Sequence, residues 1–123
     1  MKQTDQPDQE PDQERNEADT WTVRAAAADV DATILALGGY WPPLANLARL
    51  VEECGELARG VNTRFGPKPL KPGEAVPDLE EELGDMLYTS LVLAHSLGVD
   101  AETALRRAIA TARRRSAPPT GGA

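Results

Sequence analysis

The stretch "VEECGEL", residues 51–57, carries three carboxylates, Glu52, Glu53 and Glu56, within about one helical turn, and Gly55 lies between them. Like charges at this spacing repel one another, and a glycine inside a helix costs about 1 kcal/mol relative to alanine. The stretch "EELGDM", residues 81–86, repeats the pattern residue for residue from Glu52 onward. This pattern is unfavourable for a single helix, and yet it occurs twice. Its repetition indicates that the two copies act together.

The repeat places two pairs of carboxylates on equivalent flanks of two predicted helices. At about 100° per residue, Glu53 and Glu56 lie roughly 60° apart, and Glu82 and Asp85 have the same relation. If the apolar stripes of the two helices pack together, the four carboxylates converge beside the core. The glycine in each copy, Gly55 or Gly84, would then let the helices approach closely.

Four converging carboxylates need a countercharge, because they cannot all stay ionised without one. An all-oxygen site suits a hard cation, Mg²⁺ or Mn²⁺, which keeps some waters and commonly meets a phosphate. A single Glu-x-x-Glu turn is more often a solvated face, but two copies in register favour the metal site. A di-iron bundle would instead need Glu-x-x-His pairs, and the single histidine, His95, follows Val92 at that spacing.

Periodicity predicts four helices and no strand. Apolar residues recur at three- and four-residue steps over 20–37, 43–64, 78–97 and 101–115. Asp19 or Thr20 is expected to cap the first helix, and Asp100 the fourth. The fold class is all-α, a bundle of four to five helices, with the proline-rich loop 65–77 as its one long connection. The second helix carries the most complete apolar stripe: Leu47, Leu50, Val51, Cys54, Leu57, Ala58 and Val61.

Composition divides the 123 residues into a helical domain, 20–115, and two tails, 1–19 and 116–123. The first tail has no hydrophobic residue after Met1 except Ala18 and holds a charge of −5 out of a total of −7. Both tails are expected to be disordered. The helical domain therefore has neither strong acidity nor a broad basic face, which argues against binding a nucleic-acid polymer.

The remaining features favour a cytoplasmic protein. The single cysteine, Cys54, excludes an internal disulfide and suits a reducing compartment. No apolar run reaches the length of a membrane span or of a signal peptide. About 95 residues also form a small core for a lone monomer, so self-association is expected.

Residues 40–115 resemble the MazG-like family of all-α nucleoside triphosphate pyrophosphohydrolases. The resemblance rests on "ANLARLVEECGELARGVN" (45–62), the proline and lysine loop, and "DLEEELGDMLYTSLVLAHSLGVD" (78–100). It implies a helical bundle assembled as a homodimer or homotetramer. It also implies Mg²⁺-dependent hydrolysis of NTPs or dNTPs to the monophosphate and pyrophosphate.

Carried over by position, the resemblance makes Glu53, Glu56, Glu82 and Asp85 the metal ligands and Glu52 the candidate base or a further ligand. The chemistry agrees, since water attack on a phosphoryl group needs neutralised charge and a proton acceptor. The family often has Asn-Lys and an aromatic residue near the end of the last helix, where this chain has Ala110, Thr111 and Ala112. Five residues are weaker candidates for substrate binding: Trp41, Lys68, Lys71, Arg107 and Arg113.

Two other functions stay open at the level of sequence. One is hydrolysis of another diphosphate-bearing metabolite, of the phosphoribosyl-ATP kind. The other is a catalytically weak metal- or nucleotide-binding module. The sequence alone leaves open the base and sugar preference, canonical or damaged nucleotides as the target, the number of metals and the number of subunits.

Overall fold

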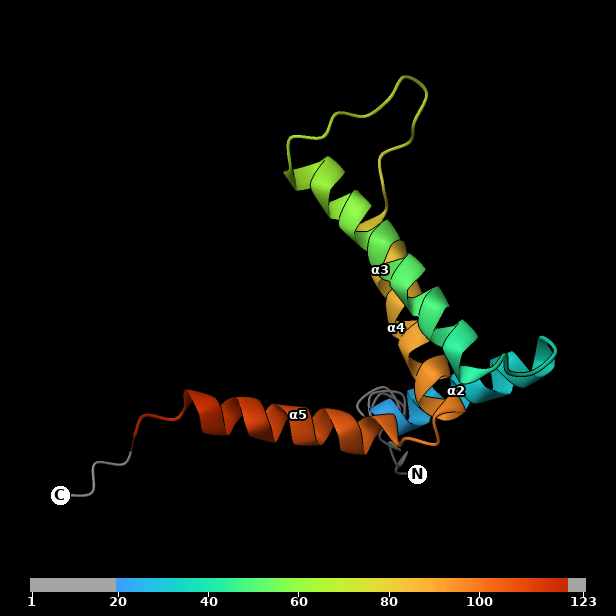
Figure 1. Ribbon diagram of the computed structural model, residues 1–123, viewed down its shortest axis with the longest axis vertical. Helices are drawn as coiled ribbons and strands as arrows, with labels where there is room; N and C mark the ends of the chain where they lie inside the picture. Colours follow the sequence, from blue (N-terminus) through green and yellow to red (C-terminus); the bar gives the residue numbers. More distant parts are fainter. Residues whose placement is uncertain (1–19, 120–123) are drawn as a thin grey trace, which may run out of the picture.

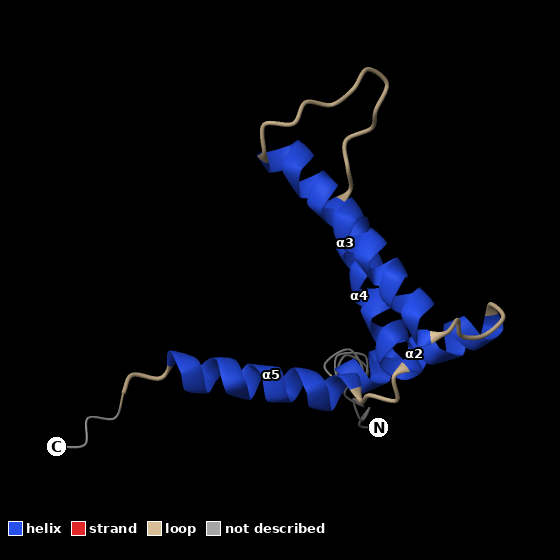
Figure 2. Ribbon diagram, viewed as in Figure 1, coloured by secondary structure: helices blue, strands red, loops and turns tan. Residues whose placement is uncertain are grey.

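The computed structural model describes residues 20–119, which form four helices and no strand (Figures 1 and 2). They are α2 (Val23–Ala36), α3 (Pro43–Phe65), α4 (Leu79–Ser96) and α5 (Ala101–Ser116). Each lies within three residues of the range that periodicity predicts, and the all-α fold class is confirmed. None of these four helices is long and apolar enough to cross a membrane. The predicted tails fall outside the described residues except for 116–119, of which Ser116 is the last residue of α5.

Side-chain caps and glycines set the helix boundaries. Asp100 accepts hydrogen bonds from the amides of Glu102 and Thr103, as predicted. The predicted cap of the first helix is wrong, because the hydroxyl of Thr22 accepts from the amide of Ala25. Gly98 ends α4 with a φ of 67°, a left-handed conformation that costs a glycine no Cβ clash.

The helices form an antiparallel pair with two further helices at one of its ends (Figure 1). The α3 and α4 helices run side by side, and the loop between them extends beyond their far end. The α2 helix packs on α4, while α5 contacts α2 and α4 and extends away from the pair. Arg24 ties α2 to the start of α5 through ion pairs of 2.8 Å to Asp100 and 2.7 Å to Glu102.

The described residues bury little apolar surface. Ala27 and Val30 of α2 and Val92 of α4 are the buried apolar side chains among them. The expectation that the stripes of α3 and α4 pack against each other holds only in part in a single chain. Leu57, Leu79 and Met86 of the stripes are half-buried, but the contact between the helices also includes a neighbouring face with Glu53 and Gly60. Cys54, predicted to lie in the stripe's core, is exposed. The apolar stripe of α4 runs through Leu79, Leu83, Met86, Leu87, Leu93 and Leu97. The large apolar residues of the two stripes that are exposed, termed the apolar face below, are Leu47, Val51, Val61, Leu83, Leu87 and Leu97.

Tyr40 holds the turn before α3 against α2 and α4. The Tyr40 hydroxyl donates a hydrogen bond of 2.5 Å to Asp31 of α2, and its ring meets the His95 ring edge-on at 6.1 Å. The Nε2 atom of His95 lies 2.6 Å from the carbonyl oxygen of Ala27. Desolvation, followed by the hydrogen bond to Asp31, raises the pKa of Tyr40 to about 12.

Replacing Tyr40 with phenylalanine tests this anchor. The change Tyr40→Phe is expected to lower the free energy of unfolding by about 1 kcal/mol at pH 7, because it removes one hydrogen bond to a carboxylate. The raised pKa means that the neutral phenol stabilises the fold, and that this contribution is lost as the pH rises through about 12. Urea unfolding at pH 7 and pH 11 measures both effects. An unchanged midpoint at both pH values would contradict the assignment.

Candidate metal and nucleotide site

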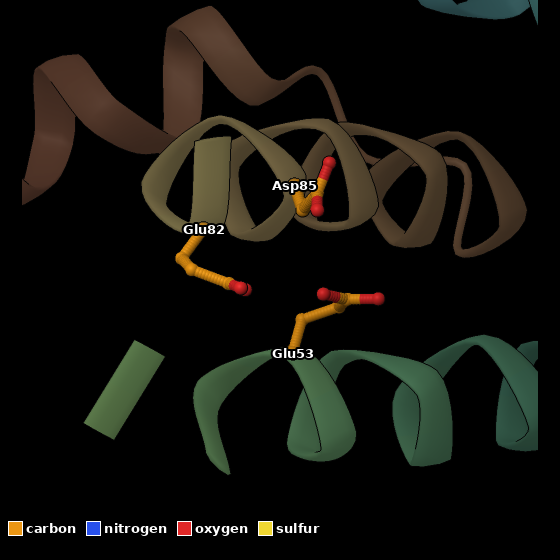
Figure 3. Close-up of side chains that lie close together, drawn as sticks. All are labelled: Glu53, Glu82 and Asp85. Carbon is orange, nitrogen blue, oxygen red and sulfur yellow. The ribbon is translucent and has the colours of Figure 1, made fainter. Parts of the chain in front are cut away.

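Three of the predicted ligands converge in the gap between α3 and α4. One carboxylate oxygen from each of Glu53, Glu82 and Asp85 lies within 4.8 Å of the others. Figure 3 shows Glu53 and Glu82 pointing toward one another across this gap, with Asp85 one turn further along α4. The middle of α3 thus faces the first half of α4, where the repeat places its acids.

The other two acids of the first copy lie outside this group. Glu52 and Glu56 are exposed, whereas Glu53 is only 8% exposed. Glu56 is nevertheless near enough that its charge acts on Glu82 more strongly than that of Asp85. In one chain, Glu53, Glu82 and Asp85 therefore form the compact group. Glu56 lies near it, and the site roles of Glu52 and Glu56 stay predictions.

The electrostatics of the group are unfavourable without a cation. Desolvation, and then the negative charges of Glu56, Asp85, Glu81 and Glu53, raise the pKa of the Glu82 carboxyl. A bound divalent cation would reverse this, because it stabilises the ionised form of each ligand.

The three carboxylates fit a hard divalent cation. In octahedral coordination with bonds of about 2.1 Å, opposite ligand atoms are about 4.2 Å apart. One carboxylate oxygen from each of the three residues lies within 4.8 Å of the others, and small side-chain rotations can bring these oxygens to the distances that a cation requires. Three oxygens also leave positions for water and phosphate, as Mg²⁺ sites usually do.

A pocket of about 370 Å³ opens beside the carboxylates. Glu53 and Asp85 form part of its wall, and Trp41, which was predicted to bind substrate, forms another. The buried amide of Asn46 donates to the carbonyl oxygen of Trp41 at 3.0 Å, so α3 fixes the backbone that carries this aromatic side chain. The remaining lining is Ile34, Leu37, Gly39, Tyr40, Arg49, Tyr88, Thr89 and Val92.

Sequence reasoning missed Arg49, which lines this pocket. Its Nε atom lies 2.9 Å from Oε1 of Glu53, one turn further along α3. A basic residue four positions before a predicted metal ligand is a signal that could have pointed to it. Asn46 and Tyr88 were also missed, because helical residues of these types carry no specific motif.

The four basic residues predicted to bind substrate are not brought to the pocket. Lys68 and Lys71 belong to the loop beyond the far end of α3, and Arg107 and Arg113 belong to α5. Within the described residues, α5 makes no contact with α3 (Figure 1). For these residues a substrate contact stays a prediction.

The repeated glycines do not mark close helix packing. A Cβ atom at Gly55 or Gly84 would meet nothing within 4 Å. Gly55 lies about 160° around the helix from Glu53, so it points away from α4. The close approach occurs at Gly60, where a Cβ atom would lie 3.0 Å from Leu79 Cδ2 and 3.3 Å from Pro77 Cβ.

Comparison with known proteins assigns the chain to a family. Residues 42–118 match the model of the MazG nucleotide pyrophosphohydrolase domain. This chain belongs to the MazG family. The predicted resemblance is thereby confirmed. The three carboxylates lie within the matched region, and the pocket is lined both by that region and by residues of the preceding segment 34–41.

Individual MazG relatives are similar over most of their length. The protein YpjD of Bacillus subtilis (strain 168) is 48% identical over 84 residues, which cover 68% of this chain and 76% of YpjD. A crystal structure of B. subtilis YpjD superposes with a TM-score of 0.65 at 45% identity, covering 73% of this chain and 93% of that one. A Bacillus-conserved MazG protein, described as a nucleotide pyrophosphohydrolase, gives a TM-score of 0.62 at 41% identity, with coverages of 73% and 87%.

Proposed function

We propose that this MazG protein hydrolyses nucleoside triphosphates to the monophosphate and pyrophosphate, with Mg²⁺ as cofactor and Mn²⁺ as a substitute. The observation that carries the proposal is the position of three carboxylates, from Glu53, Glu82 and Asp85, beside a pocket with aromatic and polar walls. The family match supports the reaction class. A cytoplasmic location belongs to the same proposal, since the nucleotide pool is there and the single cysteine needs no oxidising compartment.

The chain's own residues perform three tasks in this reaction. Glu53, Glu82 and Asp85, joined by Glu56, would hold the cation between α3 and α4. When bound there, Mg²⁺ would supply countercharge for the polyphosphate and would lower the pKa of a water molecule that attacks it. Glu52 accepts the proton of the attacking water as the new oxygen–phosphorus bond forms and the phosphoanhydride bond to pyrophosphate breaks.

The pocket receives the nucleoside. Trp41 and Tyr88 offer aromatic faces for a base, and Asn46 and Thr89 offer polar atoms. A nucleotide whose base lies there would have its phosphates near Glu53 and Asp85, because these two carboxylates line the same pocket.

Pyrophosphate release from a panel of canonical and modified NTPs and dNTPs, with Mg²⁺ and with EDTA, tests the reaction. We expect turnover only with the cation, and the monophosphate as the second product. Turnover of phosphoribosyl-ATP alone would favour the related metabolite hydrolase. Cation binding without turnover of any nucleotide would favour a binding module.

The electrostatics of Glu82 give a prediction that needs no substrate. Because its pKa is raised in the folded state, the ionised Glu82 destabilises the cation-free fold, and stability falls as pH rises through the raised pKa. At pH 7 the change Glu82→Gln is expected to raise the Tm of the cation-free protein and to reduce the further rise on adding Mg²⁺. Scanning fluorimetry with and without Mg²⁺ measures both.

Glu80→Gln is the matched control, since Glu80 is an exposed acid in the same first turn of α4. Its Mg²⁺-induced Tm shift should equal that of the wild type. A full Mg²⁺ shift in Glu82→Gln would remove Glu82 from the ligand set.

We also propose that the protein is a homo-oligomer formed through the apolar face. The stripe of α3 and that of α4 lie on the same side of the pair, because each is turned about 100° from its contact line and the helices are antiparallel. Val51 is 64% exposed and Leu87 is 55% exposed, and a contiguous exposed apolar surface of this kind often marks a protein–protein contact. A second copy placing its own pair on this face would complete a four-helix core, in a dimer or as half of a tetramer.

A further inference from the structure

Arg49 is a positively charged residue beside the proposed metal site, and none of the roles proposed above involves it. Its side chain leaves α3 on the flank that faces the pocket, one turn before Glu53. It is the single basic residue in the pocket lining, although the other arginines and lysines of the described residues are numerous. A pocket that holds the phosphates of a nucleotide needs positive charge in addition to a cation.

The present contact of Arg49 uses only part of its donor capacity. The ion pair engages Nε at 2.9 Å from Oε1 of Glu53, and among the described residues the guanidinium makes no other ion pair or hydrogen bond. The guanidinium has five N–H donors, and the fork formed by its two terminal nitrogens suits a phosphate group. The Arg49 side chain is 52% exposed, whereas the Glu53 side chain is 10% exposed, so the arginine is free to turn while the carboxylate stays in place.

A cation at Glu53 changes the partner that is available to Arg49. The carboxylate oxygen that Arg49 now contacts belongs to the same residue that would ligate the metal. Metal and guanidinium are both positive, so binding of the metal weakens the ion pair. The polyphosphate that arrives with the metal supplies a new anionic partner within the same pocket.

We propose that Arg49 binds the polyphosphate of the substrate, and that its ion pair with Glu53 holds it in place until the cation and the nucleotide bind. This inference rests on the proposed function and adds a substrate-binding residue to it. Arg49 lines the pocket, whereas Lys68, Lys71, Arg107 and Arg113 do not. It acts on binding, while the carboxylates act on the chemistry.

The test compares Arg49→Gln with the wild type in three measurements. With saturating Mg²⁺, the affinity for a triphosphate analogue with a methylene bridge between the α and β phosphorus atoms should fall by about 10-fold or more, as should kcat/KM, mainly through KM. The affinity for the unphosphorylated nucleoside should stay within about 2-fold, because the base contacts are unchanged. The affinity for Mn²⁺ alone should stay the same or increase, because a competing positive charge has been removed from Glu53.

Arg64→Gln is the control, since it makes the same change of charge on the same helix at its last turn. It should leave all three measurements unchanged. Weaker Mn²⁺ binding with normal analogue affinity in Arg49→Gln would overturn the proposal, because Arg49 would then only position Glu53. Wild-type turnover with an unchanged KM in Arg49→Gln would also overturn this inference, and it alone. A wild type without any nucleotide turnover would overturn the proposed function together with it.

Discussion

Asp85→Asn and Glu53→Gln are each expected to lower nucleotide turnover by about 100-fold or more, since a bound metal contributes several kcal/mol to phosphoryl transfer. Both changes keep the size of the side chain and remove one negative charge from the group of three carboxylates. Because an amide is a poor ligand for Mg²⁺, the affinity for Mn²⁺ should fall as well. Initial rates of pyrophosphate release and titration with Mn²⁺ measure the two effects separately.

Glu80→Gln serves as the control for both variants, because it removes an equal charge from an exposed position of α4. It should retain full activity and full metal affinity. The Tm of each variant shows that the fold is intact before its rate is interpreted. Wild-type turnover by Asp85→Asn would refute the assignment of this site, whatever the effect of Glu53→Gln.

The double change Val51→Glu and Leu87→Glu is expected to convert the oligomer to a monomer and to lower its Tm. Val51 lies on α3 and Leu87 on α4, and both belong to the apolar face. An uncompensated charge in a buried interface costs about 3–5 kcal/mol, which raises the dissociation constant by more than about 100-fold. Light scattering after size exclusion gives the mass, and scanning fluorimetry gives the Tm.

Val76→Glu provides the matched control, because Val76 is 66% exposed in the loop before α4 and lies outside the apolar face. This variant should keep the mass of the wild type. A monomeric wild type at micromolar concentration would contradict the proposal, and so would a double variant with an unchanged mass.

The fold was predictable because its signals are local. A periodicity near 3.6 residues, the proline at the start of α3 and the capping aspartate Asp100 each act within one or two turns. The failure at Thr22 has a similarly local reason, since several short polar residues precede α2 and any of them could have served as the cap. The presence of a helix can therefore be predicted even when several residues could cap it, whereas its first residue cannot.

The site was predictable to the extent that it is repeated in the sequence. The register of the two acidic turns anticipated the meeting of Glu53 with Glu82 and Asp85. It could not separate Glu53 from Glu56, because their different burial depends on the rotation of α3 against α4. Arg49 and Asn46 were beyond reach for the same reason, since a pocket is a property of packed helices and not of one of them.

The partly exposed apolar stripes show a second limit of prediction from sequence. Apolar periodicity predicts which face of a helix is buried, but it does not predict whether the same chain or a second chain buries that face. Leu47 and Leu83 satisfy the pattern and still lie at the surface of one chain. In this MazG protein, the apolar stripes of α3 and α4 would be fully buried only in the oligomer that we propose.

The direct succession of α3 and α4 along the chain has a consequence for the expected order of folding. The two helices that contact each other most extensively are separated by only residues 66–78, so their pairing closes a small loop and proceeds rapidly. The α5 helix extends away from this hairpin and gains little from it. If the protein assembles as we propose, the hairpin is expected to form in a unimolecular step at a rate independent of dilution, and burial of its apolar side in a bimolecular step whose rate increases with protein concentration.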